Sequence, residues 1–130
     1  MALPTYPFIT LAVGDTGALI TASAATTTQN SPDQYNANFR GIKVVLSTTA
    51  IGTGSITLTI QGKDSVSGSY YTILAGAAVV TNTVNVYTVF PSAPATANVS
   101  ANDFLPSAWR ILCTANNANA ATYTVSAALM

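Results

Sequence analysis

The feature that most constrains this chain is the alternation of apolar and hydroxyl-bearing residues along several short segments. Ile56, Leu58 and Ile60 alternate with serine, threonine and glutamine inside residues 54–62. A period of two places one kind of side chain on each face of a β-strand, whereas an amphipathic helix needs a period near 3.6. No segment carries a sustained helical stripe, and Glu, a common residue of solvated helix faces, is absent. The alternation therefore predicts an all-β protein.

The same pattern marks about eight candidate strands, at a spacing typical of sandwiches and barrels. They cover residues 8–13, 17–22, 40–48, 54–62, 69–75, 83–90, 107–115 and 120–129. Further apolar rows of one parity are Ile42, Val44 and Leu46; Val84, Val86 and Phe90; Trp109, Ile111 and Cys113; and Tyr123, Val125, Ala127 and Leu129. We expect a single-domain antiparallel β-sandwich, of which the jelly roll is one form, in residues 17–130. Residues 1–16 would form an extended N-terminal arm and the first strand.

Turn-forming residues separate these strands. Residues 62–68 and 116–119 are rich in Gly, Ser, Asp and Asn, which predicts two hairpins. Residues 1–7, 23–39 and 91–106 contain prolines or small polar residues and are not expected to form strands. A connection as long as 91–106 is uncommon in a compact domain and is usually functional or disordered.

The composition excludes several classes of function. The chain has 6% charged residues, no His and one Cys. Without His, most general acid–base chemistry near neutral pH and the commonest metal ligand are missing. One Cys allows neither an intrachain disulfide nor a Cys-rich zinc site. The 4 Lys and Arg residues provide no basic stripe for nucleic acid. We expect no enzyme, no cofactor and no nucleic-acid partner.

The sequence also lacks the signals that would direct it to a membrane. The first positive charge is Arg40, so no basic region precedes an apolar signal segment. The longest apolar run, residues 73–80, is interrupted by Gly76 and is too short to span a bilayer. We expect synthesis in a cytosol-like compartment and no membrane partner.

Four scattered aspartates, Asp15, Asp33, Asp64 and Asp103, are the only acidic side chains. Two of them could meet in a calcium site, with oxygens from Asn36, Asn38 or Asn102. Each aspartate, however, lies beside a Gly, Pro, Asn or Ser, where a carboxylate commonly caps a turn. The spacing matches no known calcium loop, so turn capping is the favoured interpretation and no metal site is predicted.

Aromatic residues offer a carbohydrate platform as an alternative, formed by Trp109 with Tyr70 or Tyr71. Trp109 lies on the same face of its expected strand as apolar residues, so it is expected in the core. Alternation places Tyr70 and Tyr71 on opposite faces of their strand. Cys113 is expected to be a buried, small apolar residue. Arg110 faces away from Trp109, and its expected partner is Asp64 or Asp103, within one chain or across a subunit boundary.

The strongest functional feature is apolar sequence in segments that are not core strands. The arm carries Leu3, Tyr6 and Phe8, and the 91–106 connection ends in Phe104 and Leu105. Exposed apolar loops usually mark interaction sites. We therefore predict that these residues, with Arg110, form protein contacts. The alternative is that they pack across the open ends of the chain's own sandwich.

Two stretches resemble small head-associated proteins of tailed bacteriophages. The first runs from Ile56 through Gly62-Lys63-Asp64 and Ser67-Gly68-Ser69 to Leu74, and includes Tyr70-Tyr71. The second comprises Asn102-Asp103-Phe104-Leu105-Pro106, Trp109-Arg110 and Thr122-Tyr123-Thr124-Val125. The likeness covers roughly residues 40–130 and rests on turn and strand signatures, so it carries over no catalytic residue.

The resemblance implies a non-enzymatic virion structural protein, most plausibly a decoration or cement protein on the capsid exterior. It would be assembled in the host cytoplasm and would reinforce the lattice of the major capsid protein. Such a protein is expected to be a homotrimer, with a homodimer as the alternative. The competing hypotheses are another virion component (a tail, connector or fibre module) and a carbohydrate-binding module for host attachment. An enzyme built on an aspartate pair is the least favoured.

Overall fold

A computed structural model describes residues 14–130, which form ten strands and no helix. The strands are β1 (Asp15–Ala25), β2 (Gln29–Asn30), β3 (Gln34–Tyr35), β4 (Ile42–Ala50), β5 (Ile56–Lys63), β6 (Tyr70–Ala75), β7 (Val84–Val89), β8 (Ser100–Ala101), β9 (Ala108–Ala115) and β10 (Ala121–Leu129). The strand predicted at 8–13 lies outside the described residues. The other predicted strands are all found, with ends that differ by a few residues.

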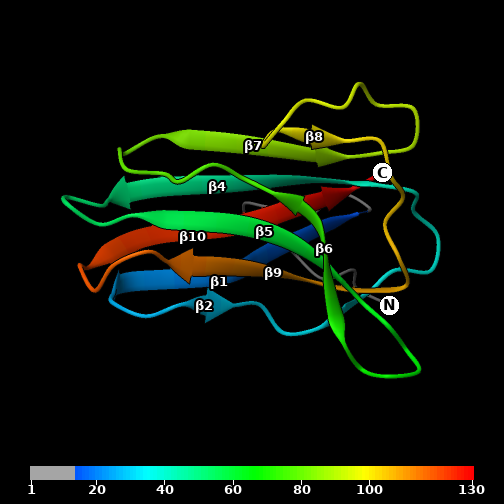
Figure 1. Ribbon diagram of the computed structural model, residues 1–130, viewed down its shortest axis with the longest axis horizontal. Coiled ribbons are helices and arrows are strands. Elements are labelled where there is room, and N and C mark those ends of the chain that lie inside the picture. Colours follow the sequence, from blue (N-terminus) through cyan, green and yellow to red (C-terminus); the bar gives the residue numbers. More distant parts are fainter. Residues whose placement is uncertain (1–13) are drawn as a thin grey trace, which may run out of the picture.

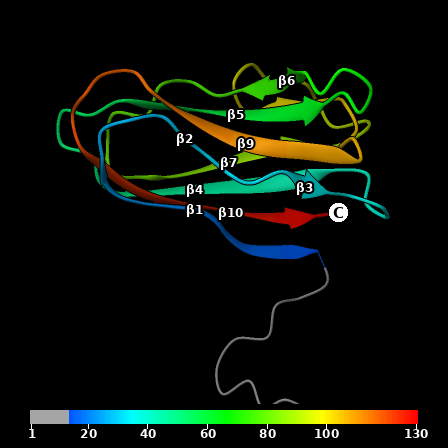
Figure 2. The same cartoon turned by 90° about the horizontal axis from the view of Figure 1, so that it is seen from below.

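The strands form two sheets that pack face to face, as the view in Figure 2 shows. Sheet A has the order β1-β10-β4-β7-β8, and sheet B has the order β2-β9-β5-β6 with β3 also paired to β9. Leaving aside β3 and β8, of two residues each, the first and last strands are neighbours in sheet A. Every connection between consecutive strands crosses from one sheet to the other except the β5–β6 hairpin, which stays in sheet B. This is the strand order of a jelly roll, so the predicted all-β sandwich is confirmed.

The core lies between the sheets and consists of the inward faces predicted from the alternation. Trp109 and Tyr123 are its largest buried side chains, at 1% exposure each. The rows on β4, β5, β9 and β10 alternate between buried and more exposed positions along each strand. Many outward positions, such as Thr57 and Thr59 on β5 and Thr122 and Thr124 on β10, carry hydroxyl groups, which meet water without adding charge. These four rows confirm the sequence prediction.

The predicted row on β7 is wrong by one residue. Val84 and Val86 point outward, with 62% and 43% exposure, and Tyr87 and Val89 are buried instead. The register with β4 explains the difference, because Tyr87 lies opposite Val44 and belongs to the face that packs against sheet B. A shift of one residue exchanges the two faces of a strand.

Two further expectations are corrected. Residues 23–39 were expected to contain no strand, yet β1 extends to Ala25, and β2 and β3 pair with β9 on either side of Pro32. Pro32 cannot donate to a ladder, which explains why this edge strand is interrupted. The sheets were also expected to be purely antiparallel, but β8 pairs parallel to β7 because residues 90–99 carry the chain back along β7 first.

Candidate interaction surface

Several connections gather at the end of the sandwich where β1 begins, which we call the loop end. It comprises residues 36–41, 64–69 and 90–107 and the C-terminal Met130 (Figure 1). β1 starts there because Asp15 pairs with Ala128, near the end of β10. The N-terminal arm therefore joins the domain at the same end as the 91–106 connection. The topology brings together the roots of two segments that the sequence analysis predicted to make contacts.

Backbone hydrogen bonds connect the root of the arm to the 91–106 connection. The Leu129 amide donates to the Gly14 carbonyl at 2.9 Å, and the Arg40 amide donates to the Met130 carbonyl at 2.7 Å. The Leu105 amide then donates to the Arg40 carbonyl at 2.8 Å. These bonds tie the loop end to the C-terminal end of the last strand.

Phe104 and Leu105 have opposite environments in this surface. Phe104 is 61% exposed, whereas Leu105 is 3% exposed and belongs to the core. The carboxylate of Asp103 accepts a hydrogen bond from the Phe104 amide at 2.8 Å. The expectation that Leu105 lends its side chain to a contact surface is therefore corrected: Leu105 anchors the loop, and this anchor holds the phenyl ring of Phe104 in solvent.

Asn36 ties the same loop to the one before β4. Its Nδ2 donates to the carbonyls of Phe39 at 2.7 Å and Leu105 at 3.1 Å, and its Oδ1 accepts from the Phe39 amide at 2.9 Å. The calcium alternative gave Asn36 a different role, as an oxygen ligand. Its amide is instead fully used in bracing the loop end.

Two further apolar side chains extend this surface, and the sequence analysis did not single them out. Tyr35 is 82% exposed at the end of β3, and Val66 is 93% exposed in the β5–β6 turn. Both line a shallow hollow of about 430 Å³ that also includes Lys63, Asp64 and Ala108. An apolar residue inside the turn 62–68 was the available signal for Val66. Tyr35 lay in a segment that showed no strand alternation.

Arg110 lies on the outer face of sheet B, half-buried, and its partners differ from those expected. Its guanidinium stacks on the ring of Tyr70, 3.5 Å from the centroid, and its Nε donates to Gln61 Oε1 at 2.8 Å. Asp64 and Asp103, the predicted partners, instead accept hydrogen bonds within their own turns. Gln61 faces Arg110 across β5 and β9, so the local register selects this partner.

The carboxylate near this stack is Asp33, just after Pro32. It accepts from Lys63 Nζ at 2.8 Å and from the Tyr70 hydroxyl at 2.6 Å. The hydrogen bond from Lys63, and then that from Tyr70, lower the pKa of Asp33 below its usual value, and the same pair raises the pKa of Lys63. We call Asp33, Lys63, Tyr70 and Arg110 the charged clasp. Through Asp33, it ties the interrupted edge of sheet B to Lys63 on β5 and Tyr70 on β6.

Asp64 and Asp103 behave as the turn-capping hypothesis predicts, whereas Asp33 binds Lys63 and Tyr70 instead. Asp64 accepts from the Ser67 hydroxyl and from the amides of Val66 and Ser67, which lowers its pKa. Asp103 accepts from the next amide along the chain. Among residues 14–130, no three His, Cys, Asp or Glu side chains lie close enough together to hold a metal ion.

The aromatic and thiol groups named in the sequence analysis are mostly covered. Trp109 is in the core, as predicted, and so is Cys113, whose pKa is raised to about 12 by burial. The Arg110 guanidinium covers one face of Tyr70, Lys63 Nζ lies 5.4 Å from the centroid of that ring, and Tyr71 is partly exposed on β6. Trp109 therefore cannot present its ring to a sugar, and one face of Tyr70 is already occupied.

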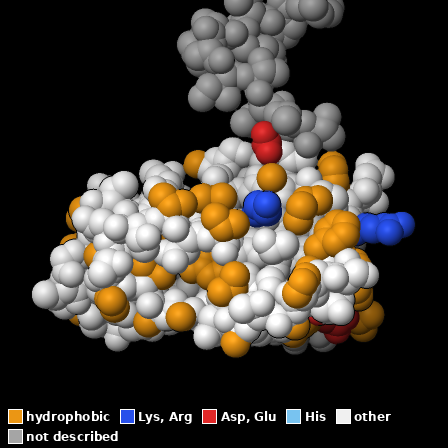
Figure 3. Space-filling model, turned by 90° about the horizontal axis from the view of Figure 1, so that it is seen from above, with side chains coloured by type: hydrophobic (Ala, Val, Ile, Leu, Met, Phe, Trp, Pro, Cys, Tyr) orange, Lys and Arg blue, Asp and Glu red, His pale blue; other side chains and the backbone are white. Residues whose placement is uncertain are grey.

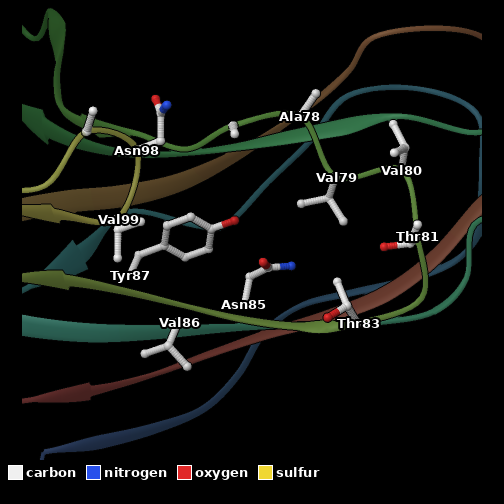
Figure 4. Close-up of a pocket in the computed structure, with 12 residues that line it drawn as sticks. Ala78, Val79, Val80, Thr81, Thr83, Asn85, Val86, Tyr87, Asn98 and Val99 are labelled. Carbon is white, nitrogen blue, oxygen red and sulfur yellow. The ribbon is translucent and has the colours of Figure 1, made fainter.

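A second apolar region lies along β7, at the opposite edge of the molecule from β1. Residues 77–81, 83, 85–87 and 97–99 line a hollow of about 380 Å³, which we call the β7 groove (Figure 4). Seen from this side, uncharged side chains dominate the surface, with few charges among them (Figure 3). The alternation pattern gave no sign of this groove, because Val84 and Val86 were expected in the core.

The predicted contact residues Leu3, Tyr6 and Phe8 lie outside the described residues. Within residues 14–130 there is no helix of the length and apolarity needed to cross a membrane. Comparison of the chain with family models, with curated proteins and with solved structures gives no match.

Proposed function

We propose that this chain is a non-enzymatic virion structural protein, a decoration or cement protein that binds the lattice of the major capsid protein as a homo-oligomer. The observation that carries the proposal is the loop end, where exposed Phe104, Tyr35 and Val66 stand on braced loops beside the root of an apolar arm. Phe104 is mostly exposed in the monomer, and aromatic anchors on rigid supports are typical of binding surfaces.

The scarcity of charge supports the same proposal. Only 6% of the residues are charged, and three of them are already used inside the charged clasp. A contact made of apolar and hydroxyl groups is little affected by ionic strength. That property suits a protein that must stay bound to a particle in changing surroundings. The resemblance to head-associated phage proteins points the same way.

The jelly roll by itself does not choose between the alternatives, since it occurs in viral capsid proteins, lectins and other classes. The carbohydrate-binding alternative is weakened because Trp109 is buried and the guanidinium of Arg110 stacks on Tyr70. Copy number separates the other virion alternatives: a cement protein is needed in far more copies per particle than a tail or connector protein.

The proposal is tested by loading the protein onto heads that lack decoration. Deletion of residues 1–8 should abolish saturable loading, and Phe104→Ser should weaken it roughly tenfold or more, as expected for a central aromatic anchor. Thr53→Ala, at an exposed position at the opposite end, is the control and should load like the unmodified chain. Full loading by both altered chains would refute the proposed contact surface.

A further inference from the structure

One long edge of sheet A is open. β7 pairs with β4 on one side, but on the other side β8 covers only Thr88 and Val89. Backbone groups of alternate residues point to the same side of a strand, and the Thr88 amide donates outward to the Val99 carbonyl at 3.0 Å. The amides and carbonyls of Val84 and Val86 therefore also point outward. Within residues 14–130, none of them has a hydrogen-bond partner.

The β7 groove runs beside this open edge and has the chemistry of a strand-binding slot. Val79 and Tyr87 form its inner wall, and Val86 is exposed at its rim (Figure 4). The Nδ2 of Asn85 borders the groove and has no acceptor among residues 14–130, although it is shielded from solvent. An added strand could place alternate side chains in the groove and over the outer valines, and could supply the missing acceptors.

We propose that the occupant of this slot is the segment Phe8–Val13 of a second copy of this chain. Its sequence, Phe-Ile-Thr-Leu-Ala-Val, is uncharged and rich in aromatic and β-branched residues, which favours an extended strand. It contains no proline, so each residue can donate to the ladder. No charged side chain lines the groove, so the two surfaces match in polarity.

The chain's own arm cannot make this contact. Gly14 is held at the β1 edge by the bond from Leu129, and β1 is separated from β7 by β10 and β4. Three strand spacings amount to roughly 14 Å, whereas Val13 lies only about 3.8 Å from Gly14 along the chain. Residues 1–7 could reach further, but Pro4 and Pro7 would interrupt their ladder. Pairing of the 8–13 segment with β7 is therefore an exchange between copies.

This inference rests on the proposed function for its setting, because it names the partner that the arm binds within the decoration oligomer. It is tested with full-length chains by disulfide trapping. One chain carries Thr10→Cys and the other Val84→Cys, and they are mixed under mild oxidation. The native Cys113 is fully buried and does not interfere. The matched control is Thr21→Cys, at an exposed position on β1.

We expect the Val84→Cys partner to form a cross-linked pair at least about tenfold faster than the Thr21→Cys partner, because docking raises the effective concentration of the thiols. Cysteines at positions 8 and 12 of the arm cover the neighbouring registers. Val86→Pro removes only an outward amide and should abolish the cross-link, with circular dichroism verifying the fold. If that variant does not fold, Val86→Lys replaces it.

Equal rates with the two partners in every register would overturn the inference. So would an intrachain bond, at high dilution, in a chain carrying both cysteines, since that would show each arm binding its own domain. Head loading separates this inference from the proposed function. Heads that are fully decorated by a chain that does not cross-link contradict only the strand exchange. Trapped pairs that do not bind heads contradict only the decoration role.

Discussion

The two sheets close their edges in different ways. At one edge of sheet B, β2 and β3 are only two residues each and are interrupted by Pro32. The charged clasp then ties this edge down through Asp33, Lys63 and Arg110. At the β7 edge of sheet A, the outward backbone groups of Val84 and Val86 are uncovered, and apolar side chains lie around them.

Natural sheets protect edges with short strands, proline and charge, because an open edge invites pairing with another chain. The edge formed by β2 and β3 has all three devices. The β7 edge has none of them between Val84 and Tyr87. Asp33, which lies between β2 and β3, is held by Lys63 at the end of β5 and by Tyr70 at the start of β6. This contrast supports the proposal that the bare edge of β7 pairs with another chain.

The largest effect on stability is expected from Tyr87→Ala, which disrupts the core beneath the open β7 edge. Tyr87 is 4% exposed and packs against Gly76, so its removal leaves a cavity beneath the groove. Truncation of a buried aromatic side chain costs about 3–5 kcal/mol. The free energy of unfolding from urea titration measures this loss. Tyr87→Phe, which keeps the ring, is the control, and a loss below about 1 kcal/mol for Tyr87→Ala would contradict the prediction.

An intermediate effect is expected from Ser31→Ala at the edge formed by β2 and β3. The buried Ser31 hydroxyl accepts from the Ile111 amide at 2.9 Å and donates to the Pro32 carbonyl at 3.0 Å. Its loss leaves a buried amide without that acceptor, which costs about 1–3 kcal/mol. Ser23→Ala, at an exposed position on β1, should change the unfolding free energy by less than about 0.5 kcal/mol. Equal values for the two variants would mean that Ser31 does not anchor this edge.

The smallest effect concerns the charged clasp and appears in the pH dependence of stability. The folded-state pKa of Asp33 is lowered, so its contribution is present above the unfolded pKa and is lost as pH falls through the folded value. Lowering the pH from about 5 to 2 should therefore destabilise the unmodified chain more than the Asp33→Asn variant. The melting temperature from thermal unfolding at each pH measures this difference. Asp64 is present in both chains and cancels in the difference. Parallel curves would show that the clasp adds nothing to stability.

The fold could be predicted largely from alternation, because a core between two sheets needs regular inward rows. The rows on β4, β5, β9 and β10 were found in this way. On β7 the pattern was ambiguous, since Tyr87 and Val89 alternate with Val84 and Val86 and both sets are apolar. Only the register with β4, which places Tyr87 opposite Val44, decides which set is buried.

The candidate surface could be predicted only in part. Apolar residues in a long connection identified Phe104, but neighbouring Leu105 has the same character and is buried. The difference depends on the hydrogen bond from the Leu105 amide to Arg40, a contact between segments far apart in the chain. Tyr35, Val66 and the β7 groove carried weak sequence signals, because exposure depends on what other strands leave uncovered.

Local sequence patterns are enough to predict the class of fold, the core rows of four strands, the burial of Trp109 and Cys113, and the capping roles of Asp64 and Asp103. Each follows from local periodicity or from a side chain acting on its own turn. Tertiary structure decided the face of β7, the partner of Arg110, the separate environments of Phe104 and Leu105, and the open edge beside the groove. These depend on register and on pairing between distant segments, which local patterns do not encode.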